Sequence, residues 1–119
     1  MAAPNILTIS TVTGKTALST LSTATSNIIT NAAASNTVNK LNEVVITNYS
    51  ASNITANVLM NRSSSTFFLS GNIAIPAYSA LVVVAKDTQV YMEEGDVLQA
   101  NVSANSAGHI YASYEIMAT

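Results

Sequence analysis

The sequence predicts an all-β fold: an antiparallel β-sandwich of the immunoglobulin-like or jelly-roll type with about eight short strands. Two observations predict it. Short runs rich in Val, Ile and Leu alternate with polar residues over much of the chain, which is the pattern of half-buried strands. Gly, Asn, Ser and Asp interrupt these runs at intervals of roughly 8 to 12 residues, a spacing typical of sandwiches. We therefore expect one β-sandwich domain with little or no helix.

The N-terminal residues 1–16 are expected to form an extended arm, followed by the sandwich domain over residues 17–119. Ile6, Ile9 and Val12 stand among Thr and Ser residues in this arm. An extended apolar segment of this kind can add a strand to the edge of a sheet. The arm is therefore predicted to form an edge strand, on its own subunit or on a neighbouring one.

Residues 17–34 are rich in Thr, Ser and Ala, and they are expected to be extended or irregular, with one strand over residues 28–30. The pattern becomes clearer over residues 41–48 and 54–60, where apolar and polar residues alternate with a period of two. The turn-like residues 49–52 separate these two runs. A hairpin joining the two strands is the prediction.

The second half of the chain contains the strongest strand signals. Gly95 is expected to adopt a positive φ that lets the chain reverse between two strands. Further turns are expected at residues 86–88 and 105–108, the second closing a hairpin onto the last strand. Leu98, Ala100 and Val102 are predicted to face inward. The strands expected in this half are residues 67–69, 73–75, 80–85, 89–92, 97–103 and 109–116, with turns at 62–66 and 70–72.

Composition argues against several classes of function. Only 8% of the residues are charged, the net charge is −2, and the four basic residues are scattered, so nucleic acid is not an expected partner. The chain has no cysteine, which excludes disulfides and thiolate metal sites. No apolar run approaches the roughly 20 residues of a membrane span, and the first residues lack the features of a secretion signal. We expect a protein made in the cytoplasm, without a membrane anchor.

The sequence contains few candidates for catalytic or metal-binding residues, and none of them stands in a recognisable motif. Glu93, Glu94 and Asp96 form the densest acidic cluster, for which a solvated turn or a weak cation site are the alternatives. His109 is the single histidine, and no recognisable nucleophile motif surrounds it. The chain is therefore not expected to be an enzyme, and we expect neither a cofactor nor a metal ion.

Subunit contact is the better supported role. A surface with so little charge is poorly protected against self-association, so we expect partner subunits to cover part of it. Tyrosine is enriched in protein interfaces, and Tyr91 and Tyr111 fall on the outward phase of their strands. Residues expected to contact another subunit or partner are Ile6, Ile9, Val12, Tyr91, His109 and Tyr111.

Three stretches, Ile75–Thr88, Tyr91–Asp96 and Ala112–Ile116, carry a resemblance to known proteins. Together with Met1–Ile6 and Thr13–Thr16, they resemble a family of small virion structural proteins of tailed phages, notably phages of cyanobacteria. The resemblance implies a non-enzymatic component present in many copies on the particle. This chain departs from the family at its turn after residue 48, where family members tend to carry an Asn-Gly or Asp-Gly type turn.

The function expected from this resemblance is that of a capsid decoration or cement subunit. Such a subunit would form a homo-oligomer, for which we expect a trimer, and would bind the major capsid protein so that the head resists internal DNA pressure. The alternative is an accessory module of the neck, tail or fibre that binds another virion protein, a host receptor or a glycan. Both place the protein in the virion.

Overall fold

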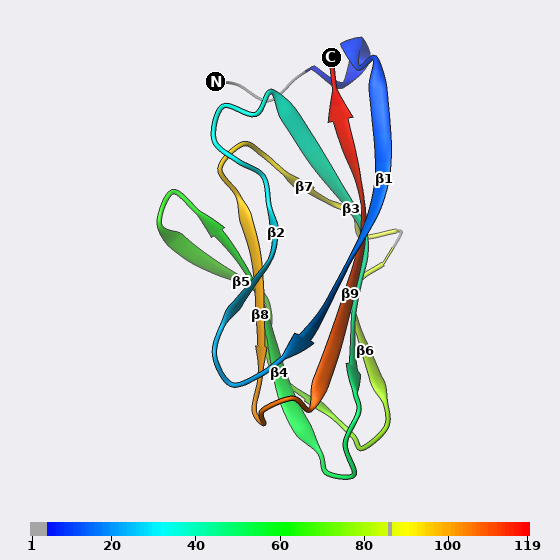
Figure 1. Cartoon of the computed structure of the whole chain (residues 1–119), viewed down its shortest axis with the longest axis vertical. Coiled ribbons are helices and arrows are strands. Elements are labelled where there is room, and N and C mark those ends of the chain that lie inside the picture. The colour runs from blue at the N-terminus through cyan, green and yellow to red at the C-terminus, as the bar shows by residue number, and fades with distance from the viewer. Residues whose placement is uncertain (1–4, 86) are drawn as a thin grey trace.

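The chain folds into a β-sandwich of two antiparallel sheets, which confirms the predicted fold class (Figure 1). The computed structural model describes residues 5–85 and 87–119. Residues 1–4 of the expected arm and Lys86 of the expected turn at 86–88 lie outside the described residues. The elements are η1 (a 3-10 helix, Ile6–Thr8), β1 (Thr11–Leu21), β2 (Ser26–Thr30), β3 (Thr37–Asn48), β4 (Ile54–Arg62), β5 (Ser65–Ile75), β6 (Ala80–Val84), β7 (Val90–Met92), β8 (Val97–Val102) and β9 (Gly108–Ala118).

The two sheets differ in strand order. Sheet A has the order β1-β9-β3-β6, and sheet B has the order β2-β8-β4-β5. The short strand β7 also belongs to sheet A, because β3 is long enough to pair with two strands along one edge. It pairs with β7 through residues 39–41 and with β6 through residues 44–47.

The core lies between the two sheets, and its residues follow from the alternation of side chains along each strand, which has a period of two residues. Alternate residues of each strand face the opposite sheet and are buried, whereas their neighbours face outward. Leu98, Ala100 and Val102 of β8 are all buried, as the sequence predicted. The other large core side chains include Leu21, Leu41, Val44, Ile46, Val58 and Ile110.

The predicted hairpins at residues 49–52 and 105–108 are wrong. The first of these turns leads from β3 in sheet A to β4 in sheet B, and the second leads from β8 in sheet B to β9 in sheet A. Within the described part of the chain, β4 and β5 are the one pair of consecutive strands that hydrogen-bond to each other. Turn residues indicate that the chain reverses direction. The same residue types occur in hairpins within one sheet and in connections between two sheets, so they do not distinguish the two.

The strand β5 is longer than the sequence predicted. Residues 70–72, expected to be a turn, continue the strand with register shifts where β5 pairs with β4. Asn72 has a φ of 50°, and its backbone N–H donates to the Oδ1 of Asn57 on β4 at 2.8 Å. A side chain from the neighbouring strand thus satisfies the backbone where the regular ladder is interrupted.

The expected division between an arm and a sandwich at residues 16 and 17 falls inside β1. This strand pairs with β9 without a break from Thr11 to Leu21, so residues 11–16 belong to sheet A of their own chain. Of the extended or irregular conformation expected after residue 17, residues 17–21 have the extended one, as the end of β1. Burial of the Leu21 side chain in the core explains why a Thr- and Ser-rich segment forms a regular strand.

Gly95 has the predicted positive φ, at 88°, in the connection from β7 to β8. Replacement of Gly95 by Ala is expected to lower the free energy of unfolding by about 1–2 kcal/mol, because an L side chain is strained in this conformation. The matched control is Gly14→Ala on β1, where φ is ordinary and no atom lies within 4 Å of the added Cβ. Urea unfolding of both variants measures the difference, and equal stabilities would contradict the prediction.

Candidate interaction surface

The outer face of sheet A carries a row of apolar side chains that crosses four strands. The pairing registers place Leu18 of β1 opposite Tyr111 of β9, Tyr111 opposite Val45 of β3, and Val45 opposite Val82 of β6. Leu18 is 77% exposed, Val82 58% and Tyr111 37%, whereas Val45, which lies between Tyr111 and Val82, is buried at 7%. We call these four residues the apolar row. Exposed apolar side chains scattered singly are ordinary, but a contiguous set is typical of an interaction surface.

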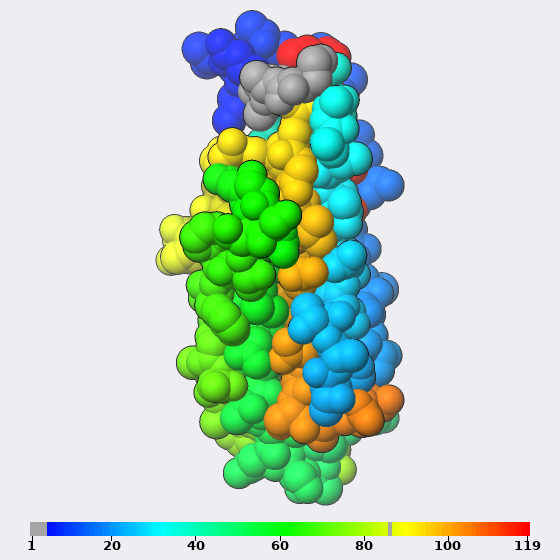
Figure 2. Space-filling view, turned by 90° about the vertical axis from the view of Figure 1, so that its left-hand side faces the viewer, coloured from blue at the N-terminus to red at the C-terminus, as the bar shows by residue number. Residues whose placement is uncertain are grey.

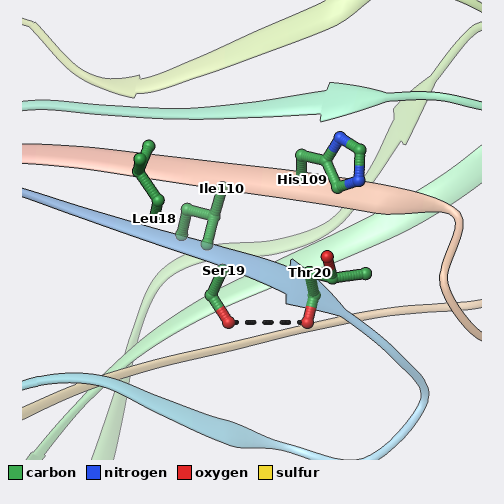
Figure 3. Close-up of a pocket in the computed structure, with 5 residues that line it drawn as sticks. All are labelled: Leu18, Ser19, Thr20, His109 and Ile110. Carbon is green, nitrogen blue, oxygen red and sulfur yellow. Dashed lines mark hydrogen bonds between the residues drawn. The ribbon is translucent and has the colours of Figure 1, made fainter.

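The row next to it, toward the start of β9, is formed by Thr20, His109, Thr47 and Ala80. The His109 ring lies against the Tyr49 ring, with 5.2 Å between the ring centroids. Figure 3 shows that Leu18 and His109 come from the neighbouring strands β1 and β9. They border a shallow depression of about 450 Å³ whose other lining residues are Ser19, Thr20 and Ile110.

The opposite end of the same face carries a second apolar group and an ion pair. Val12 is exposed and pairs with Met117, which in turn pairs with Val38, and both Met117 and Val38 are buried. Lys40 Nζ and Glu115 Oε1 lie 3.9 Å apart between the two apolar groups. The face thus has few charges.

Glu43 is the other carboxylate on this face, and its side chain is hydrogen-bonded to Tyr111 of the apolar row. The Tyr111 hydroxyl donates a hydrogen bond to Glu43 Oε2 at 3.3 Å. Partial desolvation, together with the negative charge of Glu43, raises the pKa of Tyr111 above its ordinary value. Tyr111 therefore stays neutral at physiological pH and adds no charge to the face.

Four of the six predicted contact residues share this face. Val12, His109 and Tyr111 lie on it directly, and Tyr91 lies at its edge opposite Lys40. The other two, Ile6 and Ile9, precede β1 in the N-terminal segment, where Ile6 begins η1.

The sequence did not reveal the remaining members of the apolar row. Leu18 stands in the segment expected to be extended or irregular, outside its one predicted strand, and Val45 and Val82 stand in strands whose partners were unknown. The outward phase of Val45 was visible in the alternation over residues 41–48, but its alignment with Leu18 and Val82 depends on the pairing register.

The outer face of sheet B is different, because amide side chains satisfy one another across it. Gln99 donates to Asn27 at 2.8 Å, Asn57 donates to Asn101 at 2.9 Å, and Asn101 donates to Thr25 at 3.0 Å. This face is uncharged at these positions, and it also carries Phe68, which is 62% exposed. Sheet A exposes more apolar side chains on its outer face, with Val12, Leu18, Val82 and Tyr111.

The acidic turn between β7 and β8 is an internal ion-pair site. Asp96 is fully buried, and its carboxylate accepts hydrogen bonds from Arg62 Nε at 2.8 Å and Arg62 Nη2 at 2.6 Å. The backbone N–H of Glu93 also donates to Asp96, and Glu94 accepts from the backbone of Asn36. The hydrogen bonds to Asp96 raise the pKa of Arg62 above its already high ordinary value. The expected solvated turn is therefore wrong for Asp96.

Among the described residues, no three His, Cys, Asp or Glu side chains are placed to hold a metal ion together. In the same part of the chain, no helix is long and apolar enough to cross a membrane. No family model and no curated protein matches the chain.

Proposed function

We propose that the chain is a non-enzymatic structural subunit of a tailed-phage virion, and specifically a capsid decoration subunit that binds the major capsid protein. The observation that carries the proposal is the apolar row on the outer face of sheet A. The resemblance of the sequence to small phage virion proteins supports it. The subunit would be made in the host cytoplasm and incorporated into the particle.

The physical basis is burial of apolar area. Leu18, Val82 and Tyr111 offer apolar atoms on one side of a regular sheet. Lys40 is paired with Glu115, whereas Glu43 accepts a hydrogen bond from the neutral Tyr111 hydroxyl and keeps its negative charge, so a partner must offer Glu43 a donor or leave it in water. Each contact is small, but the symmetry of a capsid repeats it many times and strengthens the whole shell.

Copy number tests this proposal against its alternative. A decoration subunit should approach the abundance of the major capsid protein in a stained gel of purified virions of the encoding phage. A neck, tail or fibre module that binds another virion protein or a host glycan would be far scarcer. Absence of the chain from purified virions would contradict both versions.

Substitution of the apolar row is the second test. The double variant Leu18→Ser/Val82→Ser is expected to bind capsids that lack the subunit roughly 10- to 100-fold more weakly, because two exposed apolar side chains no longer become buried. Binding is measured by cosedimentation with the capsids. The matched control is Phe68→Ser, which removes an exposed apolar side chain from the outer face of sheet B. Equal binding by the double variant and the parent would refute docking through the apolar row.

A further inference from the structure

The strand β1 is an edge strand of sheet A whose second side has no partner in the described part of the chain. It pairs with β9 alone, over its whole length from Thr11 to Leu21 and without a register shift. About half of the backbone N–H and C=O groups of an edge strand point away from the sheet, where they can bind another strand. Residues 11–16 are all exposed, and in Figure 2 the blue residues of β1 follow the right-hand margin of the molecule.

The other edges of the two sheets have features that hinder pairing with another chain. The strand β2 has five residues and a register shift between Asn27 and Ile29, and β5 pairs with β4 through register shifts. The far edge of sheet A is divided between the short strands β6 and β7, which have five and three residues. Bulges and short strands are among the means by which natural sheets avoid pairing at their edges. The strand β1 has neither, and it contains no proline and one charged residue, Lys15.

We propose that β1 of one copy pairs with β1 of a second copy, in antiparallel orientation and about a two-fold axis through Thr16. Two copies that present the same edge to each other about such an axis run antiparallel, so each strand meets the donors and acceptors that it needs. The contact joins the two A sheets into one continuous sheet. The outer faces of both copies then lie on the same side, and the two apolar rows lie on one surface.

Burial and charge along the strand place the axis at Thr16. Leu21 is fully buried, so the accessible part of the strand ends at Thr20. An axis at Thr16 pairs residues 12–20 of the two copies. An axis at Lys15 would pair as many residues, but it would place two lysines directly opposite each other, and like charges so placed destabilise a sheet. An axis farther along the strand would pair fewer residues, and a register shifted by one residue would set outward side chains beside inward ones.

The side chains also fit this register. Leu18, which is largely exposed in the single subunit, lies opposite the partner's Gly14. Glycine has no side chain, and no atom lies within 4 Å of the position that a Cβ of Gly14 would take, so Leu18 has room to lean across the neighbouring strand. Lys15 lies opposite the partner's Ala17, an uncharged residue with a small side chain. Shape and charge therefore favour the same register as the backbone pairing.

Single cysteines test this register, because the chain has no cysteine of its own. Thr16→Cys brings two thiols together at the axis, where directly opposite Cα atoms lie about 4.5–5.5 Å apart, within the range of a disulfide. Thr13→Cys is the matched control, since Thr13 is exposed on the same strand but would lie about 20 Å from its own copy. Mild oxidation is expected to crosslink at least about 10-fold more of the Thr16→Cys variant into dimers, measured by non-reducing gel electrophoresis. Circular dichroism checks that both variants keep their β-structure.

Sedimentation velocity of the parent chain over a concentration series gives the mass of the assembly. A two-fold contact produces a dimer, which this measurement distinguishes from a monomer and from a trimer. Both experiments use the purified chain without capsids, so their outcome does not depend on the proposed function, which the copy number in virions tests separately. The proposal is overturned if the parent does not form a dimer at high concentration, or if Thr16→Cys crosslinks no more than Thr13→Cys.

Discussion

Replacement of Arg62 by Met is expected to lower the free energy of unfolding by about 2–4 kcal/mol. The substitution leaves the Asp96 carboxylate fully buried with the backbone N–H of Glu93 as its remaining donor. Breaking a buried ion pair by removing one partner costs about 3–5 kcal/mol, and the half-exposed position of Arg62, which lets water approach, reduces the expected loss. Urea unfolding at a fixed subunit concentration measures the effect.

The control for this prediction is Lys40→Met, which breaks an ion pair whose carboxylate, Glu115, is partly exposed whereas Asp96 is fully buried. That pair is 3.9 Å long and should contribute less than about 1 kcal/mol. A second variant, Arg62→Met/Asp96→Asn, removes the uncompensated charge and should recover part of the lost stability. A loss for Arg62→Met no larger than that for Lys40→Met would show that the buried pair does not stabilise the fold.

The reason for this large effect lies in the position of the pair. Arg62 ends β4 in sheet B, whereas Asp96 lies in the connection that leaves sheet A through β7. Asn31, in the connection from β2 to β3, also joins the site: its N–H donates to the Asp96 carbonyl at 2.9 Å and its carbonyl accepts from Gly95 at 2.7 Å. The site therefore fastens the two sheets together at one end of the sandwich.

Replacement of Asn48 by Ala is expected to cost about 2–4 kcal/mol, because it leaves several buried backbone groups without partners. Asn48 is fully buried, and its amide donates to the carbonyls of Ser52, Ile75 and Pro76 at 2.7, 3.0 and 3.1 Å. Its Oδ1 accepts from the backbone N–H and the hydroxyl of Ser50. One side chain thus holds the connection from β3 to β4 and the start of the connection from β5 to β6.

The matched control is Asn101→Ala on the outer face of sheet B. Asn101 also makes side-chain hydrogen bonds, to Asn57 and Thr25, but it is only partly buried and water can replace its partners. We expect a loss of less than about 1 kcal/mol for this control. Urea unfolding of both variants gives the comparison, and a similar small loss for Asn48→Ala would mean that the loop reorganises at little cost.

Asn48 also explains the conformation of the turn at residues 49–52. The loop is shaped by hydrogen bonds to the Asn48 side chain and does not need the Asn-Gly or Asp-Gly dipeptide of a tight hairpin. Because β3 and β4 belong to different sheets, a two-residue hairpin turn would not suit this position.

The candidate surface was partly visible in the sequence. Alternation along the strands identified Tyr91, His109 and Tyr111 as outward-facing, and the structure places them with Val12 on or at the edge of one face of sheet A. The burial of Asp96 was missed, because its partner Arg62 stands 34 positions away in the chain.

The sequence by itself determined the class of fold, the burial phase of strands such as β8, and the positive φ of Gly95. These properties depend on local patterns: a period of two along a strand and the conformational freedom of one residue. Only the tertiary structure decided which strands pair, that β3 and β4 lie in different sheets, and that Leu18 and Val82 join Tyr111 in one row. Hydrogen bonds between strands use backbone groups that every residue shares, so the choice of partner is made by how the two sheets pack around their common core.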